Sequence, residues 1–70
     1  MRIILQNRES QLYFQDLEKW TSNRDDAFDF QHIVNASDFV LRHKLLNMEM
    51  VLTFRDPEND LRIPASPPTP

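Results

Sequence analysis

The chain of 70 residues contains no glycine and no cysteine. Phosphate-binding loops and the dinucleotide-binding fingerprint need glycine, because their backbone turns tightly and approaches the anion closely. Both motifs are therefore excluded. Without cysteine the chain can form no disulfide, no thiolate metal site and no cysteine nucleophile. A reducing cytosol is the simplest compartment for such a sequence, so we expect a cytoplasmic protein.

The sequence also lacks a long apolar run and an excess of positive charge. The largely apolar stretch at residues 1–5 ends at Gln6, which is too short for a signal-peptide core or for the roughly 18 residues of a membrane span. The formal net charge is −3, and basic and acidic residues are interleaved. A negative field repels nucleic acid and anionic membranes, so we expect a soluble, untargeted protein without membrane contact.

The chain does have enough apolar residues to fold. Hydrophobic residues make up 40% of it and include five phenylalanines, Tyr13 and Trp20, which is more than a disordered chain carries. Seventy residues form one domain near the lower size limit for a self-sufficient core. A partner or a second copy would therefore add needed stability.

The two-residue period of side chains predicts the strands. Residues 2–7 have apolar side chains on both faces, as in an interior strand, and residues 28–30 and 48–54 alternate. Residues 2–7 and 11–16 favour a β-hairpin. Without glycine, its turn is either a longer loop or has Asn7 in the left-handed region. Residues 28–30 predict a brief third strand with both phenylalanine rings on one side. Residues 48–54 predict the best-defined strand, whose inward side chains are Met48, Met50, Leu52 and Phe54.

One short turn and one helix are expected between these strands. Ser22 and Asp25 have the spacing of a capping box, which supports a single helical turn and places Ala27 inward. Asn35 can cap the main helix, and Asn47 can end it in the left-handed conformation. The helix would pack on the sheet through one apolar face, formed by Ala36, Phe39, Val40, His43 and Leu46.

These elements predict the α+β class. We expect a small three- to four-stranded sheet, made of a β-hairpin, a short third strand and a final strand, with a single helix packed on one face. A right-handed crossover would bring the final strand parallel to the first. The compact domain spans residues 1–63, and a proline turn at 56–59 ends the sheet. Residues 64–70 form a proline-rich disordered tail, in which Pro64 and Pro67 have PxxP spacing but are better explained as a spacer.

The motif order gives a resemblance. Trp20 and Thr21 precede an acidic turn, Ala27, the phenylalanine pair at 28–30 and a helix led by Ala36. This order resembles a family of small bacterial and phage-borne domains, most of them uncharacterised, with a displayed Trp-Thr pair and the same succession of elements. The similarity covers residues 2–54. The resemblance implies a fold and a bacterial source, and it assigns no active site.

The sheet face that the helix leaves uncovered, the helix-free face, is the main functional clue. It would expose Ile4, Tyr13 and Val51, an apolar set larger than a solvated face usually carries. With the neighbouring edge at Phe28 and Phe30, these residues are the candidate interaction surface. We expect a small accessory or regulatory module that binds another protein or forms a homodimer through this surface.

Nucleic-acid binding is the alternative from a different class. Arg2, Arg8 and Lys19 beside Trp20 could form a basic platform on which bases stack. The acidic balance of the chain opposes this hypothesis. A salt titration separates the two functions, because phosphate contacts weaken steeply with salt whereas an apolar interface barely responds.

No pattern indicates catalysis, a metal or a cofactor. His32 and His43, with several aspartates, could be drawn as a metal cluster, but the separation of the histidines matches neither a zinc finger nor an HExxH helix. No serine lies in a recognisable nucleophile motif. So small a chain would also struggle to enclose a pocket of ~300 Å³. We expect a protein that is not an enzyme and has no small-molecule substrate.

Overall fold

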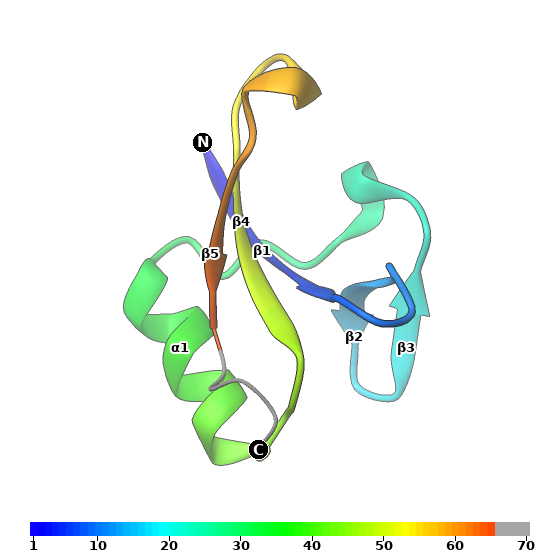
Figure 1. Cartoon of the computed structure of the whole chain (residues 1–70), viewed down its shortest axis with the longest axis vertical. Helices are drawn as coiled ribbons and strands as arrows, with labels where there is room; N and C mark the ends of the chain where they lie inside the picture. Colours follow the sequence, from blue (N-terminus) through cyan, green and yellow to red (C-terminus); the bar gives the residue numbers. More distant parts are fainter. Residues whose placement is uncertain (66–70) are drawn as a thin grey trace.

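The computed structural model describes residues 1–65 and contains one antiparallel sheet with a helix on one face (Figure 1). The strand order is β3-β2-β1-β4-β5. The strands are β1 (Arg2–Asn7), β2 (Tyr13–Asp16), β3 (Lys19–Thr21), β4 (Met48–Thr53) and β5 (Leu61–Pro64). The α+β class is therefore confirmed, with five strands where three or four were expected.

The central strands β1 and β4 run antiparallel, so the expected parallel arrangement is wrong. The reason lies before the helix, where the Phe30 N–H donates to the Ile3 carbonyl at 2.8 Å and brings the chain back to the start of β1. The helix then runs in the direction of β1. At its far end the Arg8 N–H donates to the Asn47 carbonyl at 2.7 Å. β4 begins there and can only return antiparallel.

Both hairpins turn without glycine. In the β1–β2 loop the Asn7 side chain accepts hydrogen bonds from the N–H groups of Glu9 and Ser10, at 2.8 and 3.0 Å. The longer loop is therefore the alternative that forms, and its left-handed residue is Gln11, with φ 65°. β2 turns into β3 through two residues, of which Glu18 is left-handed with φ 59°. Side-chain hydrogen bonds and left-handed polar residues replace glycine here.

The expected short helical turn is present after β3. It is a 3-10 turn, η1 (Arg24–Asp26), preceded by Asn23, whose side chain accepts a hydrogen bond from the Asp25 N–H at 3.0 Å. The cap is therefore Asn23 and not Ser22. Ala27 is buried, as predicted.

Residues 28–30 do not form the expected third strand. The Phe28 N–H donates to the Phe14 carbonyl of β2 at 2.9 Å, whereas the Phe30 N–H donates to the Ile3 carbonyl of β1. β1 and β2 pair over only a short length, and this segment fills the gap where they diverge. Because it bonds to two different strands, it cannot build a ladder with either.

The helix α1 (Ile33–Arg42) begins earlier than expected. Asn35 lies inside it, and its side-chain amide donates to the Phe30 carbonyl at 3.1 Å. The apolar face is confirmed in its centre, where Ala36 and Val40 are buried and Phe39 is partly buried. His43 and Leu46 lie beyond the helix end and are exposed.

The helix ends at a Schellman motif. The Leu45 N–H donates to the Val40 carbonyl at 3.0 Å, and the Lys44 N–H donates to the Leu41 carbonyl at 3.3 Å. Lys44 takes the left-handed position, with φ 53°. Asn47 is also left-handed, with φ 59°, but it lies after the helix and leads into β4.

The sheet does not end at the proline turn. The 3-10 turn η2 (Pro57–Asn59) returns the chain along the free edge of β4, where β5 pairs with it. Pro64 is the last residue of this edge strand, a place where a missing N–H is tolerated. The Ala65 N–H then donates to the Met48 carbonyl at 2.9 Å. The rest of the predicted tail, residues 66–70, lies outside the described residues.

The core has two parts, one on each side of the sheet. The helix side contains Ile3, Leu5, Phe14, Phe30, Ala36, Val40, Met48, Met50 and Leu52. The helix-free side contains Ile4, Tyr13, Ala27 and Val51. Phe54, expected to point inward at the end of the final strand, follows β4 and is 40% exposed.

Candidate functional site

The helix-free face is not an exposed apolar surface. Ile4 and Val51 are 0% exposed and Tyr13 is 9% exposed. These residues form one buried cluster with Ala27. The prediction that they display an interaction surface is wrong, because the η1 turn brings the chain back over this face.

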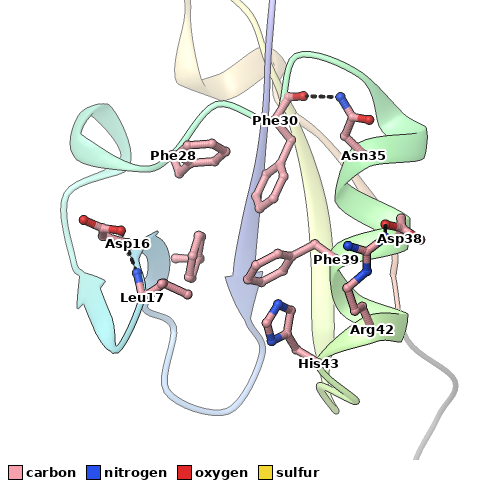
Figure 2. Close-up of a pocket in the computed structure, with 10 residues that line it drawn as sticks. Asp16, Leu17, Phe28, Phe30, Asn35, Asp38, Phe39, Arg42 and His43 are labelled. Atoms are coloured by element: carbon pink, nitrogen blue, oxygen red, sulfur yellow. Dashed lines mark hydrogen bonds and ion pairs between the residues drawn. The ribbon is translucent and has the colours of Figure 1, made fainter.

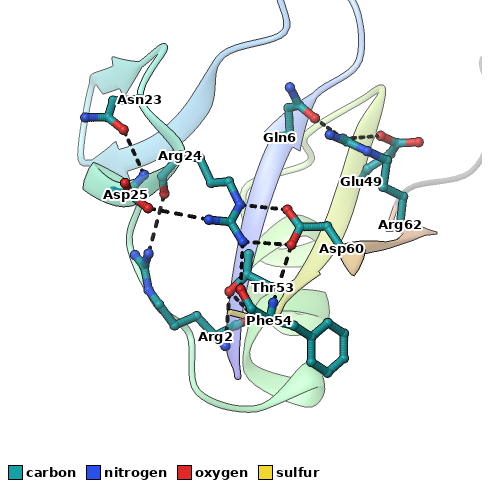
Figure 3. A network of polar contacts seen from close by, with 10 residues as sticks. All are labelled: Arg2, Gln6, Asn23, Arg24, Asp25, Glu49, Thr53, Phe54, Asp60 and Arg62. Carbon is teal, nitrogen blue, oxygen red and sulfur yellow. Dashed lines mark hydrogen bonds and ion pairs between the residues drawn. The ribbon is translucent and has the colours of Figure 1, made fainter. Parts of the chain in front are cut away.

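A polar network closes the same face (Figure 3). Arg24 binds both carboxylate oxygens of Asp60 through Nε and Nη2, each at 2.7 Å, and its Nη2 also donates to the Phe54 carbonyl at 3.0 Å. We call this pair the Arg24–Asp60 clamp, because it ties η1 to the start of β5. Arg2 donates to the Ala27 carbonyl and so holds the end of η1 to β1. A second set of side-chain bonds joins β5 to the sheet centre through Arg62, Gln6 and Glu49.

Three side chains, two of them in the clamp, have their pKa shifted toward the charged form. The hydrogen bond to Asp60 raises the pKa of Arg24 against the opposing effect of burial. The hydrogen bond from Arg24 lowers the pKa of Asp60, again against burial. For Asp29, burial alone would raise the pKa, but the N–H groups of Ile3 and Gln31 outweigh it and lower the pKa. These shifted groups are all bound to neighbouring protein atoms.

The helix leaves part of its own side of the sheet uncovered. A five-stranded sheet is roughly 19 Å wide at the usual strand spacing, whereas a helix with its side chains is about 10–12 Å across. Because α1 packs on β1 and β4, the sheet beside β2 has no helix above it. An open groove lies there, between the β2–β3 hairpin and α1 (Figure 2).

Aromatic rings line this groove, which we call the aromatic groove. Phe14 of β2 lies at its centre, with the ring centroids of Phe39 and Phe30 at 4.7 and 5.8 Å. Phe28 meets Phe30 edge-on at 4.8 Å. The rings of Phe28, Phe30 and Phe39 point into the space between hairpin and helix (Figure 2). Such edge and tilted contacts are the favoured geometries for aromatic pairs.

The groove consists of two adjoining hollows. The first has a volume of about 400 Å³ and is lined by Phe28, Phe30, residues of α1 and the helix C-cap His43. The second has a volume of about 540 Å³ and is lined by Trp20, Glu18 and Leu45. The lining residues common to both are Phe14, Leu17, Phe39 and His43. Both hollows are open to solvent, so they provide a binding surface of this size without the enclosed pocket that so small a chain was expected to lack.

Three large apolar side chains are exposed around the groove. Leu17 is 71% exposed, Phe28 48% and Trp20 36%. Leu17 occupies the hairpin tip, where its N–H donates to Asp16 Oδ1 at 2.8 Å. Eight other large apolar side chains in residues 1–65 are exposed away from the groove. Leu17, Phe28 and Trp20 differ from them in surrounding one concavity, an arrangement typical of interaction sites.

The charged residues of the groove are mostly acidic. They are Asp16, Glu18, Asp38 and Arg42. Arg42 pairs with Asp38 at 2.9 Å, so these two charges compensate each other. Within residues 1–65, neither Asp16 nor Glu18 has an ion-pair partner. Lys19 is the register partner of Asp16 across the hairpin, so Asp16, Glu18 and Lys19 together leave the hairpin side of the groove with a net negative charge.

The structure separates the predicted surface residues into two groups. Phe28 and Phe30 line the aromatic groove, whereas the other three lie on the opposite side of the sheet. Sequence reasoning missed Phe14, Leu17, Phe39 and His43 as groove residues. One local signal was available: Leu17 is an apolar residue between two acidic residues at a chain reversal, where burial cannot be its purpose.

The structure does not gather the predicted basic platform. Arg2 and Arg8 lie at opposite ends of β1, about 20 Å apart at the usual rise of a strand. Arg2 is occupied by the η1 carbonyls, and Arg8 lies 3.8 Å from Glu49. Trp20 faces the groove on Phe14, at 5.8 Å.

The acidic and histidine residues have structural surroundings. In the part of the chain that the structure describes, no three side chains of metal-binding type converge. His32 precedes the first turn of α1, and His43 packs on Phe39 with a centroid distance of 4.3 Å. No helix in residues 1–65 is long and apolar enough to cross a membrane.

Comparison with known proteins gave no match to a family model, a curated protein or a solved structure. The geometry and chemistry of the aromatic groove are therefore the basis for assigning a function.

Proposed function

We propose that this chain is a small protein-binding module of the bacterial cytoplasm, and that the aromatic groove is its binding surface. One observation carries the proposal: Leu17, Phe28 and Trp20 are exposed around a single concave site between a hairpin and a helix. Partly exposed aromatic side chains in such a site are the residues that dominate binding at protein interfaces.

Binding is favoured over catalysis by the position of the perturbed groups. Catalytic sites are where shifted pKa values are expected to face a pocket. Here the shifted groups Arg24, Asp29 and Asp60 are all engaged in the network that holds η1 and the following segment to the sheet. None of them lines the groove.

Photo-crosslinking in the native host tests the proposal. A photoreactive amino acid replaces Leu17 in one variant and Leu41 in another, since these side chains are 71% and 66% exposed but Leu41 lies outside the groove. We expect a protein partner to crosslink at position 17 and not at position 41. The purified partner should then bind the Phe28→Asp variant about 30-fold more weakly, the loss expected for an interface hot spot.

Equal crosslinking at the two positions, or full binding by the Phe28→Asp variant, would contradict the proposal.

Self-association through the groove is the homodimer form of the same proposal. Sedimentation equilibrium at about 100 μM tests it, because a dimer with a micromolar dissociation constant would be fully formed at that concentration.

A further inference from the structure

The two hollows of the groove differ in the chemistry of their walls. The first is lined by the rings of Phe28, Phe30 and Phe39. Its one cation, Arg42, is paired with Asp38, and its other carboxylate, Asp16, comes from the hairpin. The second is lined by Trp20 and by Glu18, a carboxylate without an ion-pair partner in the described chain. The wall beside Phe28 in the first hollow therefore suits an apolar side chain, and the second hollow, with Trp20 and Glu18, suits a cation.

The side walls of the second hollow favour a cation in two ways. An ammonium or guanidinium group is attracted to the face of an indole more strongly than to other rings. Glu18 lines this hollow, and Asp16, on the other side of Leu17 at the hairpin tip, lines the adjoining one, so both charges lie along the same groove. Complementary charge at the rim of an interface selects the partner and speeds its association.

The shape of the groove indicates an extended segment. The hollows adjoin and share Phe14 and Phe39 as a common wall. In an extended peptide, side chains two positions apart point the same way and are separated by about 7 Å. Two such side chains can occupy adjoining hollows of one groove.

From these observations we infer that the aromatic groove binds an extended peptide segment of a partner protein through an apolar side chain and a lysine or arginine two positions away. The apolar side chain occupies the hollow beside Phe28, and the cation occupies the hollow beside Trp20 and Glu18. This inference rests on the proposed function and specifies the partner's chemistry.

Synthetic peptides test the inference directly. Trp20 is the only tryptophan of the chain, so its emission reports on the second hollow. The probes are three eight-residue peptides of sequence Leu-Ser-Xaa-Ser-Leu-Ser-Xaa-Ser, in which leucine and the variable residue Xaa lie two positions apart. The variable residue is lysine, glutamine or glutamate. We expect the lysine peptide to change Trp20 emission and to bind about tenfold more tightly than the glutamine peptide, with the glutamate peptide weakest.

Charge reversal in the groove provides the matched control. The Asp16→Lys, Glu18→Lys double variant should reverse the order of the three peptides. The Asp56→Lys, Glu58→Lys double variant changes the net charge equally at the β4–β5 turn, outside the groove lining, and should keep the wild-type order. Circular dichroism confirms that both variants are folded.

The outcomes separate this inference from the proposed function. Equal binding of the lysine and glutamine peptides would overturn the cation preference but leave an apolar protein-binding groove. If both double variants lose the preference for the lysine peptide, net charge alone explains that preference, and the assignment to Asp16 and Glu18 is overturned. Absence of binding by all three peptides would overturn the inference, whereas the crosslinking at Leu17 decides the proposed function independently.

Discussion

The two sides of the sheet bury their apolar residues by different means. On the helix-free side, a short turn carrying one alanine, held by the Arg24–Asp60 clamp, covers Ile4, Tyr13 and Val51. On the other side a ten-residue helix covers the centre of the sheet but not its β2–β3 flank. The exposed aromatic surface therefore lies beside the helix, on the side that a helix is usually assumed to protect. How much of a sheet face is covered depends on the width of the covering element relative to the sheet and not on the presence of a helix.

The largest expected effect comes from a charge placed on the closed side. Val51→Lys puts an unpaired ammonium group where the wild-type side chain is 0% exposed. The destabilisation should exceed ~4 kcal/mol, against a total stability of roughly 4–10 kcal/mol for a domain of this size. We expect an unfolded protein by circular dichroism. Leu17→Lys, on the open side, is the control and should shift the free energy of unfolding by less than ~0.5 kcal/mol. If both variants melt cooperatively near the wild-type temperature, the two sides of the sheet do not differ as described.

Within the groove, buried and exposed rings should differ in their contribution to stability. Phe30 is 7% exposed and Phe28 is 48% exposed. Phe30→Ala should lower the free energy of unfolding by about 3–5 kcal/mol, whereas Phe28→Ala should lower it by about 1 kcal/mol because much of its ring is already in water. Urea denaturation measures both. Equal losses would mean that Phe28 belongs to the core and is not a binding residue.

The clamp should contribute less than a core ring but more than an ordinary surface pair. Asp60→Ala removes both hydrogen bonds to Arg24 and should cost about 1.5–3 kcal/mol, the usual range for bonds to charged groups. Asp56→Ala is the control, because Asp56 precedes η2 without a side-chain capping bond. Thermal melts compare the two variants, and an equal effect would show that the clamp adds nothing specific.

Acid should weaken the clamp in a defined direction. The pKa of Asp60 is lowered in the folded state by the Arg24 hydrogen bond, so the folded state binds fewer protons than the unfolded state near pH 4. The resulting stabilisation is fully present above the unfolded pKa of ~3.9 and is lost as the pH falls through the lower folded value. Melting temperatures between pH 7 and pH 2.5 should fall more for the wild type than for Asp60→Asn. Asp29, whose folded pKa is also lowered, keeps part of this dependence in the variant.

The smallest expected effect is a stabilisation. Lys44 is left-handed at the end of α1, a conformation that strains a residue with a Cβ by ~1–2 kcal/mol. Glycine would remove this strain, but its larger loss of backbone entropy on folding would offset part of the gain. Lys44→Gly should raise the free energy of unfolding by about 0.5–1 kcal/mol. Asn47→Gly should raise it less, because asparagine tolerates this region better and because the substitution removes the hydrogen bond that the Asn47 amide donates to Glu9 Oε1 at 2.9 Å. Chemical denaturation of the two variants gives the difference, and destabilisation by Lys44→Gly would contradict the assigned helix end.

The elements with their own strong pattern could be predicted from the sequence. An apolar run located β1, alternation located β4, and the 3.6-residue period located the centre of α1. Each pattern reflects burial, which is on both faces of the sheet for β1 and β4 and on one face for α1. β5 could not be predicted in the same way. Its four residues are too few to show a period, and they form a strand because η2 returns them to the free edge of β4.

The groove was harder to predict than the fold. Phe28 and Phe30 alternate as a strand would, but hydrogen bonds to two different strands direct them into the space beside α1. The closure of the helix-free face depends on Arg24 and Asp60, which are 36 positions apart. No local pattern predicts such a pair. The sequence alone therefore indicated a binding surface on the helix-free face, which the η1 turn covers.

The outer edge of β5 has a consequence for behaviour at high concentration. Ladder bonds alternate along an antiparallel strand, and the Ala65 N–H is directed to β4, so the outward positions of β5 are Arg62 and Pro64. Proline offers no N–H, which leaves the amide of Arg62 as the donor that β5 can present to an incoming strand. A charged residue and a proline on a sheet edge are known to discourage strand-to-strand aggregation. The molecule can therefore keep an open aromatic groove without also offering β5 as a template for fibrils.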